Sequence, residues 1–91
     1  MRVSIRLFGA FRQFQDSDLL ELEMPDAQRP DAATVADVRL ALDAYALAHW
    51  RGYDAGLLRS SAFATEEAVL RANSPIPVDG RLAVIPPVSG G

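Results

Sequence analysis

Apolar and polar residues alternate near both ends of this chain, and a helical pattern separates the two alternating segments. The inward positions are Val3, Ile5 and Leu7 in Arg2–Phe8, and Leu82 and Val84 in the segment RLAVI. A period of two is typical of a strand with one buried face, so both segments are predicted strands. Because the chain between them is long enough for a crossover, we expect these strands to lie side by side and parallel.

A second alternating segment, Leu19–Met24, follows shortly after the first. The intervening residues AFRQFQDS begin after Gly9 and are expected to turn the chain back through a short helical turn. The two segments therefore read as antiparallel neighbours. The next residues, Pro25–Ala33, contain two prolines and no periodicity, so a loop is predicted there.

The middle of the chain predicts the main helix. Thr34 followed by Asp37 resembles a capping box, and apolar side chains recur at helical spacing up to about His49. Those apolar positions are Val35, Val38, Leu42 and Tyr45. Gly52 is a plausible end of the helix, and Trp50 and Tyr53 are expected to cover that end.

Short elements fill the region between the helix and the last strand. The segment GLLRSS predicts a helical turn, and AFAT and AVL predict two short strands around the turn at Glu66–Glu67. Asp79–Gly80 is a tight-turn signal before the last strand. Pro86–Pro87 cannot donate ladder hydrogen bonds, so they end the sheet and direct the following residues outward in an extended form.

This order of elements predicts an α+β domain in which one main helix packs on one face of a mixed sheet. The opposite face of the sheet has no helix to cover it. With 91 residues, the chain is the size of one small domain. We assign residues 1–87 to that domain and residues 88–91 to a flexible C-terminal tail.

Composition excludes several classes of function. The chain has no cysteine and one histidine, so it offers no thiol nucleophile, disulfide or thiolate metal site. Nine arginines, no lysine and twelve carboxylates give a net charge of −3. That balance argues against nucleic acid or an anionic membrane as partner. No apolar run is long enough to span a membrane, so a cytoplasmic protein is expected.

The ionisable residues form no pattern that is specific for catalysis. Glu66–Glu67 and the pair Asp16 and Asp18 fall in turn-like segments, where solvated carboxylates are the more frequent explanation. His49 lies at the predicted helix end, where capping or packing explains it better than catalysis. The sequence therefore predicts a protein that is not an enzyme on its own.

Three segments resemble a known family. The C-terminal DGRLAVIPPVSGG, the N-terminal VSIRLFGAFR and the helix opening ATVADVRLAL are similar to MoaD, the small subunit of molybdopterin synthase. The resemblance implies a β-grasp (ubiquitin-like) fold and a sulfur carrier of molybdenum cofactor biosynthesis. It also implies that Gly91, preceded by Gly90, carries sulfur as a C-terminal thiocarboxylate and donates it to the molybdopterin dithiolene.

The resemblance further implies two protein partners. An adenylating (MoeB-like) enzyme uses ATP to activate the Gly91 carboxylate, and the large (MoaE-like) subunit of the synthase receives the loaded tail. No cofactor is expected to stay bound to the chain itself. Glycine suits this role because it lacks a Cβ atom and can thread a narrow channel.

A docking surface is predicted beside the tail. If Leu82 and Val84 face the helix, Ala83 and Ile85 point outward next to Phe8 on the uncovered face. The segment that follows is expected to contact partners as well, through Pro86, Pro87, Val88 and Ser89.

Other readings stay open. A ThiS-like carrier could run the same chemistry for thiamin thiazole, cysteine, tRNA thiolation or protein conjugation, although ThiS chains are shorter and usually lack the Pro-Pro pair. The remaining alternative is a plain β-grasp interaction module whose glycines are inert.

Overall fold

The computed structural model describes residues 2–24 and 33–87. Residues 1, 25–32 and 88–91 lie outside the described residues, which includes most of the predicted Pro25–Ala33 loop. The elements in chain order are β1 (Arg2–Leu7), the 3₁₀ helix η1 (Gly9–Phe14), β2 (Leu19–Glu23), α1 (Val35–His49), α2 (Ala55–Arg59), β3 (Ala62–Ala64), β4 (Val69–Leu70) and β5 (Arg81–Ile85).

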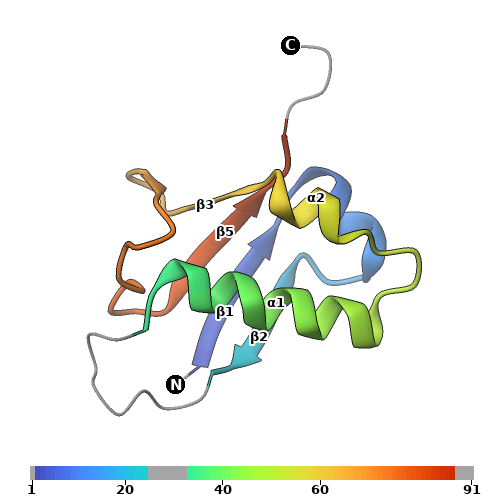
Figure 1. Cartoon of the computed structure of the whole chain (residues 1–91), viewed down its shortest axis with the longest axis horizontal. Coiled ribbons are helices and arrows are strands. Elements are labelled where there is room, and N and C mark those ends of the chain that lie inside the picture. The colour runs from blue at the N-terminus through green and yellow to red at the C-terminus, as the bar shows by residue number, and fades with distance from the viewer. Residues whose placement is uncertain (1, 25–32, 88–91) are drawn as a thin grey trace.

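The strands form one mixed sheet in the order β2-β1-β5-β3-β4. β1 and β5 are the parallel central pair, and Leu7 lies opposite Val84. All other neighbouring strands are antiparallel. Helix α1 crosses one face of this sheet (Figure 1), so the predicted α+β architecture with a central parallel pair is confirmed.

The core lies between α1 and the sheet. β1 contributes Val3, Ile5 and Leu7, and β5 contributes Leu82 and Val84, all of them buried. The helix supplies the facing side chains Val35, Val38, Leu42 and Ala46. Burial of these apolar side chains is the main driving force that holds the helix on the sheet.

The beginning of α1 is the predicted capping box. The Thr34 backbone N–H donates to Asp37 Oδ2 at 2.8 Å. An acidic side chain in the first turn also suits the positive end of the helix dipole. Together these contacts explain why the helix begins at this point in the chain.

Aromatic side chains close the other end of α1. Trp50 is the C-cap residue, and its ring stacks on Phe14 at 5.0 Å between centroids. Its indole Nε1 donates to Gln15 Oε1 at 3.1 Å, and Tyr53 meets its edge. The prediction that Trp50 and Tyr53 cover the helix end is confirmed, and η1 supplies the opposing ring.

Arg39 joins α1 to α2. Its guanidinium donates to the backbone carbonyls of Leu58 and Ser61 and lies 5.0 Å from the centre of the Phe63 ring. The carbonyls at the C-terminal end of a helix lack partners within the helix, and a cation there satisfies them.

A few predicted boundaries differ from the structure by one or two residues. Strand β1 ends at Leu7 and not at Phe8. Phe8 still has an extended backbone, but it is the N-cap residue of η1. β2 ends at Glu23 rather than Met24, β3 ends before Thr65, and β4 begins at Val69 rather than Ala68. Met24 is nevertheless buried on the core side, as its place in the alternating pattern predicts.

Candidate functional site

The face of the sheet opposite α1 carries the predicted docking residues. Along β5, Leu82 is only 4% exposed, whereas Ile85 is 39% exposed and Ala83 is half-buried. Leu82 and Val84 therefore face α1, and Ala83 and Ile85 face away from it. The predicted orientation of the last strand is confirmed.

Phe8 and Ile85 lie at the same end of this open face. Because Leu7 pairs with Val84, continuing the parallel register places Phe8 level with Ile85. Phe8 is 43% exposed, and Ala62 of β3 lies opposite Ile85 on the other side. The next row across the sheet consists of Leu19, Arg6, Ala83, Ala64 and Val69.

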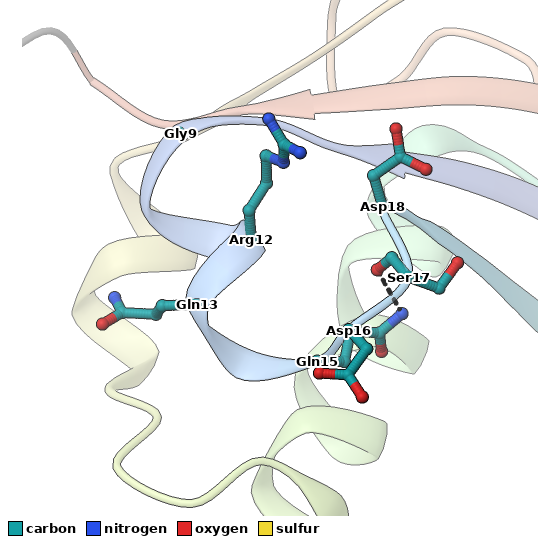
Figure 2. A pocket seen from close by; sticks show the side chains of 7 residues that line it. All are labelled: Gly9, Arg12, Gln13, Gln15, Asp16, Ser17 and Asp18. Atoms are coloured by element: carbon teal, nitrogen blue, oxygen red, sulfur yellow. Dashed lines mark hydrogen bonds between the residues drawn. The ribbon is translucent and has the colours of Figure 1, made fainter.

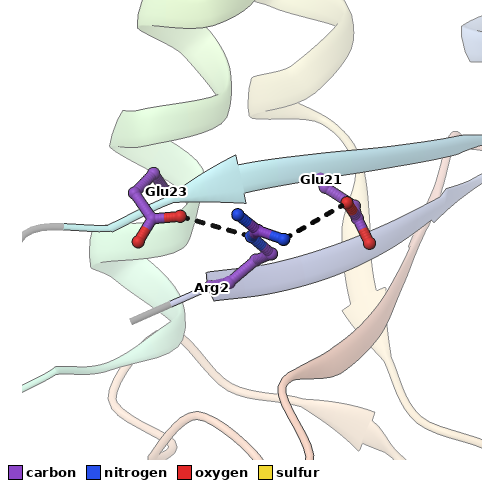
Figure 3. Close-up of polar contacts among 3 residues, drawn as sticks. All are labelled: Arg2, Glu21 and Glu23. Carbon is purple, nitrogen blue, oxygen red and sulfur yellow. Dashed lines mark hydrogen bonds and ion pairs between the residues drawn. The ribbon is translucent and has the colours of Figure 1, made fainter.

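The opposite end of the open face is charged. Arg2 Nε lies 3.3 Å from Glu23 Oε2, and Arg2 Nη1 lies 3.9 Å from Glu21 Oε2 (Figure 3). Exposed pairs of this kind contribute little to stability. Their effect is to divide the face into a charged end and an apolar end, and the chain leaves β5 at the apolar end.

Pro86 and Gly9 form the exit of the chain from β5. Pro86 is half-buried and Pro87 is exposed. Gly9 has φ +56°, and a Cβ atom built on it would lie 2.6 Å from Cγ of Pro86. Only glycine therefore leaves room for the proline ring at the end of β1, so Gly9 and Pro86 together fix where the chain leaves the sheet.

Replacing Gly9 tests this contact, and Gly52 supplies a matched control. Both glycines have positive φ, but a Cβ atom on Gly52 meets nothing within 4 Å. Each substitution by alanine costs about 1–2 kcal/mol for the left-handed backbone. We expect Gly9→Ala to lower the free energy of unfolding further and to shift the NMR signals of Val84 and Pro87, whereas Gly52→Ala leaves those signals in place. Equal costs and unchanged Pro87 signals in both variants would contradict the contact.

A shallow polar hollow adjoins Gly9. Figure 2 shows Arg12 and Asp18 on opposite sides of it, with η1 and the connection to β2 forming its walls. Gln15 is held there because its amide donates to the backbone oxygens of Ser17 and Leu19. The lining combines both signs of charge in an open position, so it lacks the enclosure that ligand-binding pockets have.

The two candidate acid–base pairs lie in different parts of the fold. Asp16 and Asp18 line the polar hollow, whereas Glu66 and Glu67 occupy the β3–β4 turn, which the Thr65 hydroxyl caps by accepting from the Glu67 and Ala68 N–H groups. His49 packs against Tyr45 with the two rings tilted and their centres 4.4 Å apart, which is the packing role that the sequence predicts. Within residues 2–24 and 33–87, no three His, Asp or Glu residues are close enough to hold a metal ion.

Tyr53 has a shifted pKa, and its role is structural. Burial, followed by the hydrogen bond to Asp43 Oδ1 at 2.7 Å, raises the pKa of Tyr53 far above its ordinary value. The phenol therefore stays protonated at every physiological pH. It ties the segment after α1 to the helix, and it lies in the aromatic cluster rather than on the open face.

The remaining predicted site residues are Val88, Ser89, Gly90 and Gly91, and they lie outside the described residues. The structure thus brings together Phe8, Ala83 and Ile85 at one end of the open face, and Pro86 and Pro87 follow Ile85 directly in the chain. Sequence reasoning used Gly9 only as the end of a strand and missed its contact with Pro86. The available signal was a glycine and a Pro-Pro pair at the ends of two strands predicted to be parallel neighbours.

Comparison with known proteins identifies the fold. No protein-family model matches the chain, and no curated protein matches it. Among solved structures, the crystal structure of SAMP1 from Haloferax volcanii matches with a TM-score of 0.62 and 22% sequence identity over 100% of both chains. This match confirms the β-grasp, ubiquitin-like fold with its mixed five-stranded sheet and main helix. In the described part of the chain, no helix is long and apolar enough to cross a bilayer.

Proposed function

We propose that this chain is a ubiquitin-like sulfur carrier that works as the small subunit of a molybdopterin synthase. The observation that carries the proposal is the exit from β5. There the chain passes from the apolar end of an open sheet face into Pro86–Pro87 and then into the sequence VSGG. A domain with this arrangement can dock outside a partner while its last residues enter the partner's active site.

The chemistry takes place on the Gly91 carboxylate. A carboxylate is a poor electrophile, so an activating enzyme first joins it to the α-phosphorus of ATP and releases pyrophosphate. Hydrosulfide released by a sulfur donor then attacks the acyl carbon, the C–O bond to AMP breaks, AMP leaves, and a thiocarboxylate forms. This requires the α-carboxyl group of Gly91 to be free, and it needs no catalytic side chain from the carrier.

Residues 88–91 are long enough for this task, and the last two of them have no side chains. Fully extended, four residues span about 14 Å. Gly90 and Gly91 add no side chains, so the acyl carbon stays unhindered in a narrow channel. Pro86 and Pro87 restrict the backbone at the base of this segment, which reduces the entropy lost when it enters a partner.

The apolar end of the open face is proposed to bind both partners. Phe8 and Ile85 are the large apolar side chains of its outermost row, and Pro86 follows Ile85 directly in the chain. The activating enzyme and the synthase large subunit each need the same tail. If both bind the same surface, the carrier must dissociate from the activating enzyme before it binds the synthase subunit.

Arginine substitutions test this surface. We expect Phe8→Arg and Ile85→Arg to weaken binding to both partners by about ten- to a hundredfold, since burying such a side chain contributes roughly 1.5–3 kcal/mol. Val78→Arg is the matched control, because Val78 is fully exposed in the loop before β5. Titration calorimetry measures the affinities, and circular dichroism verifies that each variant is folded. Equal affinities for Ile85→Arg and Val78→Arg would place the interface elsewhere.

The pathway is tested by discharge of the loaded carrier. Mixed with the molybdopterin synthase large subunit and its cyclic pyranopterin substrate, the sulfurated chain should lose its sulfur as the dithiolene forms. With a thiazole synthase it should stay loaded. Discharge only to the thiazole enzyme would assign the chain to thiamin biosynthesis, and intact-mass spectrometry distinguishes the two results.

A further inference from the structure

The outward face of α1, on the side away from the sheet, carries apolar side chains that are largely exposed. Leu40 is 70% exposed and Leu47 is 63% exposed, and the exposed Ala44 lies between them on the same face. Surface helices normally place charged side chains on the face opposite the core. A helix with apolar side chains on both sides is usually covered on both sides.

The charged residues of α1 do not interrupt this stripe. Arg39 reaches around to the end of α2, and Asp43 accepts the hydrogen bond of Tyr53. Asp37 lies at the beginning of the stripe and caps Thr34. The two leucines are therefore left without a charged neighbour on the outward side of the middle of the helix.

The stripe has the spacing of a coiled-coil seam. Within α1 its members follow one another at intervals of three, four and three residues, and they are Asp37, Leu40, Ala44 and Leu47. That alternation keeps side chains on one side of a helix over successive turns. Arg51 is exposed and follows the extended C-cap residue Trp50, so it lies outside the helix, directly after the end of α1.

The same five residues read as a palindrome in chemical character. Measured from Ala44, a leucine stands on either side, and beyond the leucines stand one acid and one base. An antiparallel pair of such helices places Leu40 against Leu47 of the other copy, and it brings Asp37 in the first turn toward Arg51, which follows the helix end of the other copy. A parallel pair would instead place Asp37 against Asp37 and Arg51 against Arg51, and it would align the two helix dipoles.

We infer that a second copy of this chain covers the stripe, in an antiparallel helix pair whose two-fold axis passes beside Ala44. The contact is isologous, so the same patch serves both copies. Small Ala44 at the axis lets the helices approach to the short end of the usual 8–10 Å range, and the leucines fill the space on either side. The outer Asp37–Arg51 pairs fix the antiparallel direction.

The pair is weak and leaves the docking face free. Two leucines and one alanine per copy form a contact smaller than about 1,200 Å², the range of transient encounters. Because α1 covers the face of the sheet opposite Phe8 and Ile85 (Figure 1), each copy keeps its open face and its tail exit accessible. The inference rests on the helix alone and stands whether or not the chain carries sulfur.

Cysteine cross-linking tests the register, since the chain has no cysteine of its own. At the axis, Ala44→Cys should form a disulfide with itself at high protein concentration. In the antiparallel pair, residue 40 of each copy lies about 10–12 Å along the axis from residue 40 of the other, beyond disulfide reach. Leu40→Cys alone should therefore form no disulfide-linked dimer, and a mixture of Leu40→Cys and Leu47→Cys should cross-link as a mixed pair. Val69→Cys, as exposed as Leu40 but on the open face, sets the background.

Analytical ultracentrifugation of proteins without introduced cysteines supplies the second measurement. The native chain should show a concentration-dependent dimer, Leu47→Glu should raise its dissociation constant at least tenfold, and Val69→Glu should leave it unchanged. Self-cross-linking of Leu40→Cys as efficient as that of Ala44→Cys would overturn the antiparallel register. A native chain that stays monomeric at the highest concentration, with Ala44→Cys no more reactive than Val69→Cys, would overturn the pairing itself.

Discussion

Leu82→Arg is expected to unfold the domain, whereas Ile85→Arg, on the same strand, leaves it folded. Leu82 is 4% exposed against α1, and Ile85 is 39% exposed on the open face. The substitution at Leu82 removes a buried apolar side chain, worth roughly 1.5–3 kcal/mol, and places an unpaired charge in the core. Domains of this size are stable by only about 5–15 kcal/mol in total, and the cost of an unpaired buried charge, added to the lost apolar side chain, is large enough to exceed that stability.

Urea unfolding followed by circular dichroism measures both variants. The Leu82→Arg protein should lack a cooperative transition, and the Ile85→Arg protein should keep a midpoint close to that of the native chain. Leu82→Met is the control for side-chain shape, because a volume-conserving apolar change costs less than about 1.5 kcal/mol. The reverse pattern, with Ile85→Arg unfolded and Leu82→Arg intact, would mean that β5 is turned over in the sheet.

The sheet was predictable because period-two alternation determines which side chains share a face. Val3, Ile5 and Leu7 and their counterparts on β5 needed no more information than their spacing, and the long connection between the two strands supplied the crossover that a parallel pair requires. The capping box at Thr34 likewise marked the beginning of α1, because the residues that form it are neighbours in the chain. Local chemistry of this kind is visible in a sequence.

Contacts between distant segments were harder to predict. The Gly9–Pro86 approach joins residues at opposite ends of the chain, and its closeness depends on the register between β1 and β5, which alternation alone does not set. The aromatic cluster has the same character, since Phe14 comes from η1 and Trp50 from the end of α1. Helical spacing predicts the core side of α1, but it does not predict whether Leu40 and Leu47 on the other side are covered.

Deleting Gly90 and Gly91 is expected to abolish sulfur loading while the domain keeps its stability. The last described strand ends at Ile85, so the deletion removes no hydrogen bond of that ladder, and the two glycines have no side chain to bury. The free energy of unfolding should change by less than about 0.5 kcal/mol, the usual range for surface changes. A loss larger than this would show that the removed residues pack against the domain.

An extended chain provides the matched control for the deletion. Adding one alanine after Gly91 keeps both glycines but moves the free carboxylate to a residue with a Cβ atom. We expect this variant to fold like the native chain and to resist adenylation, measured as ATP–pyrophosphate exchange with the activating enzyme. Normal exchange by the extended chain would mean that the enzyme does not select for a terminal glycine.

The location of the sulfur tests the central claim most directly. After incubation with a MoaD-type activating enzyme, ATP and a sulfur donor, the chain should gain the mass of one oxygen-to-sulfur exchange, and fragmentation should place it on Gly91. With no cysteine in the sequence, no thiol side chain can hold the sulfur instead. An unchanged mass, or a sulfur placed anywhere other than the Gly91 carboxyl group, would contradict the role of this chain as a sulfur carrier.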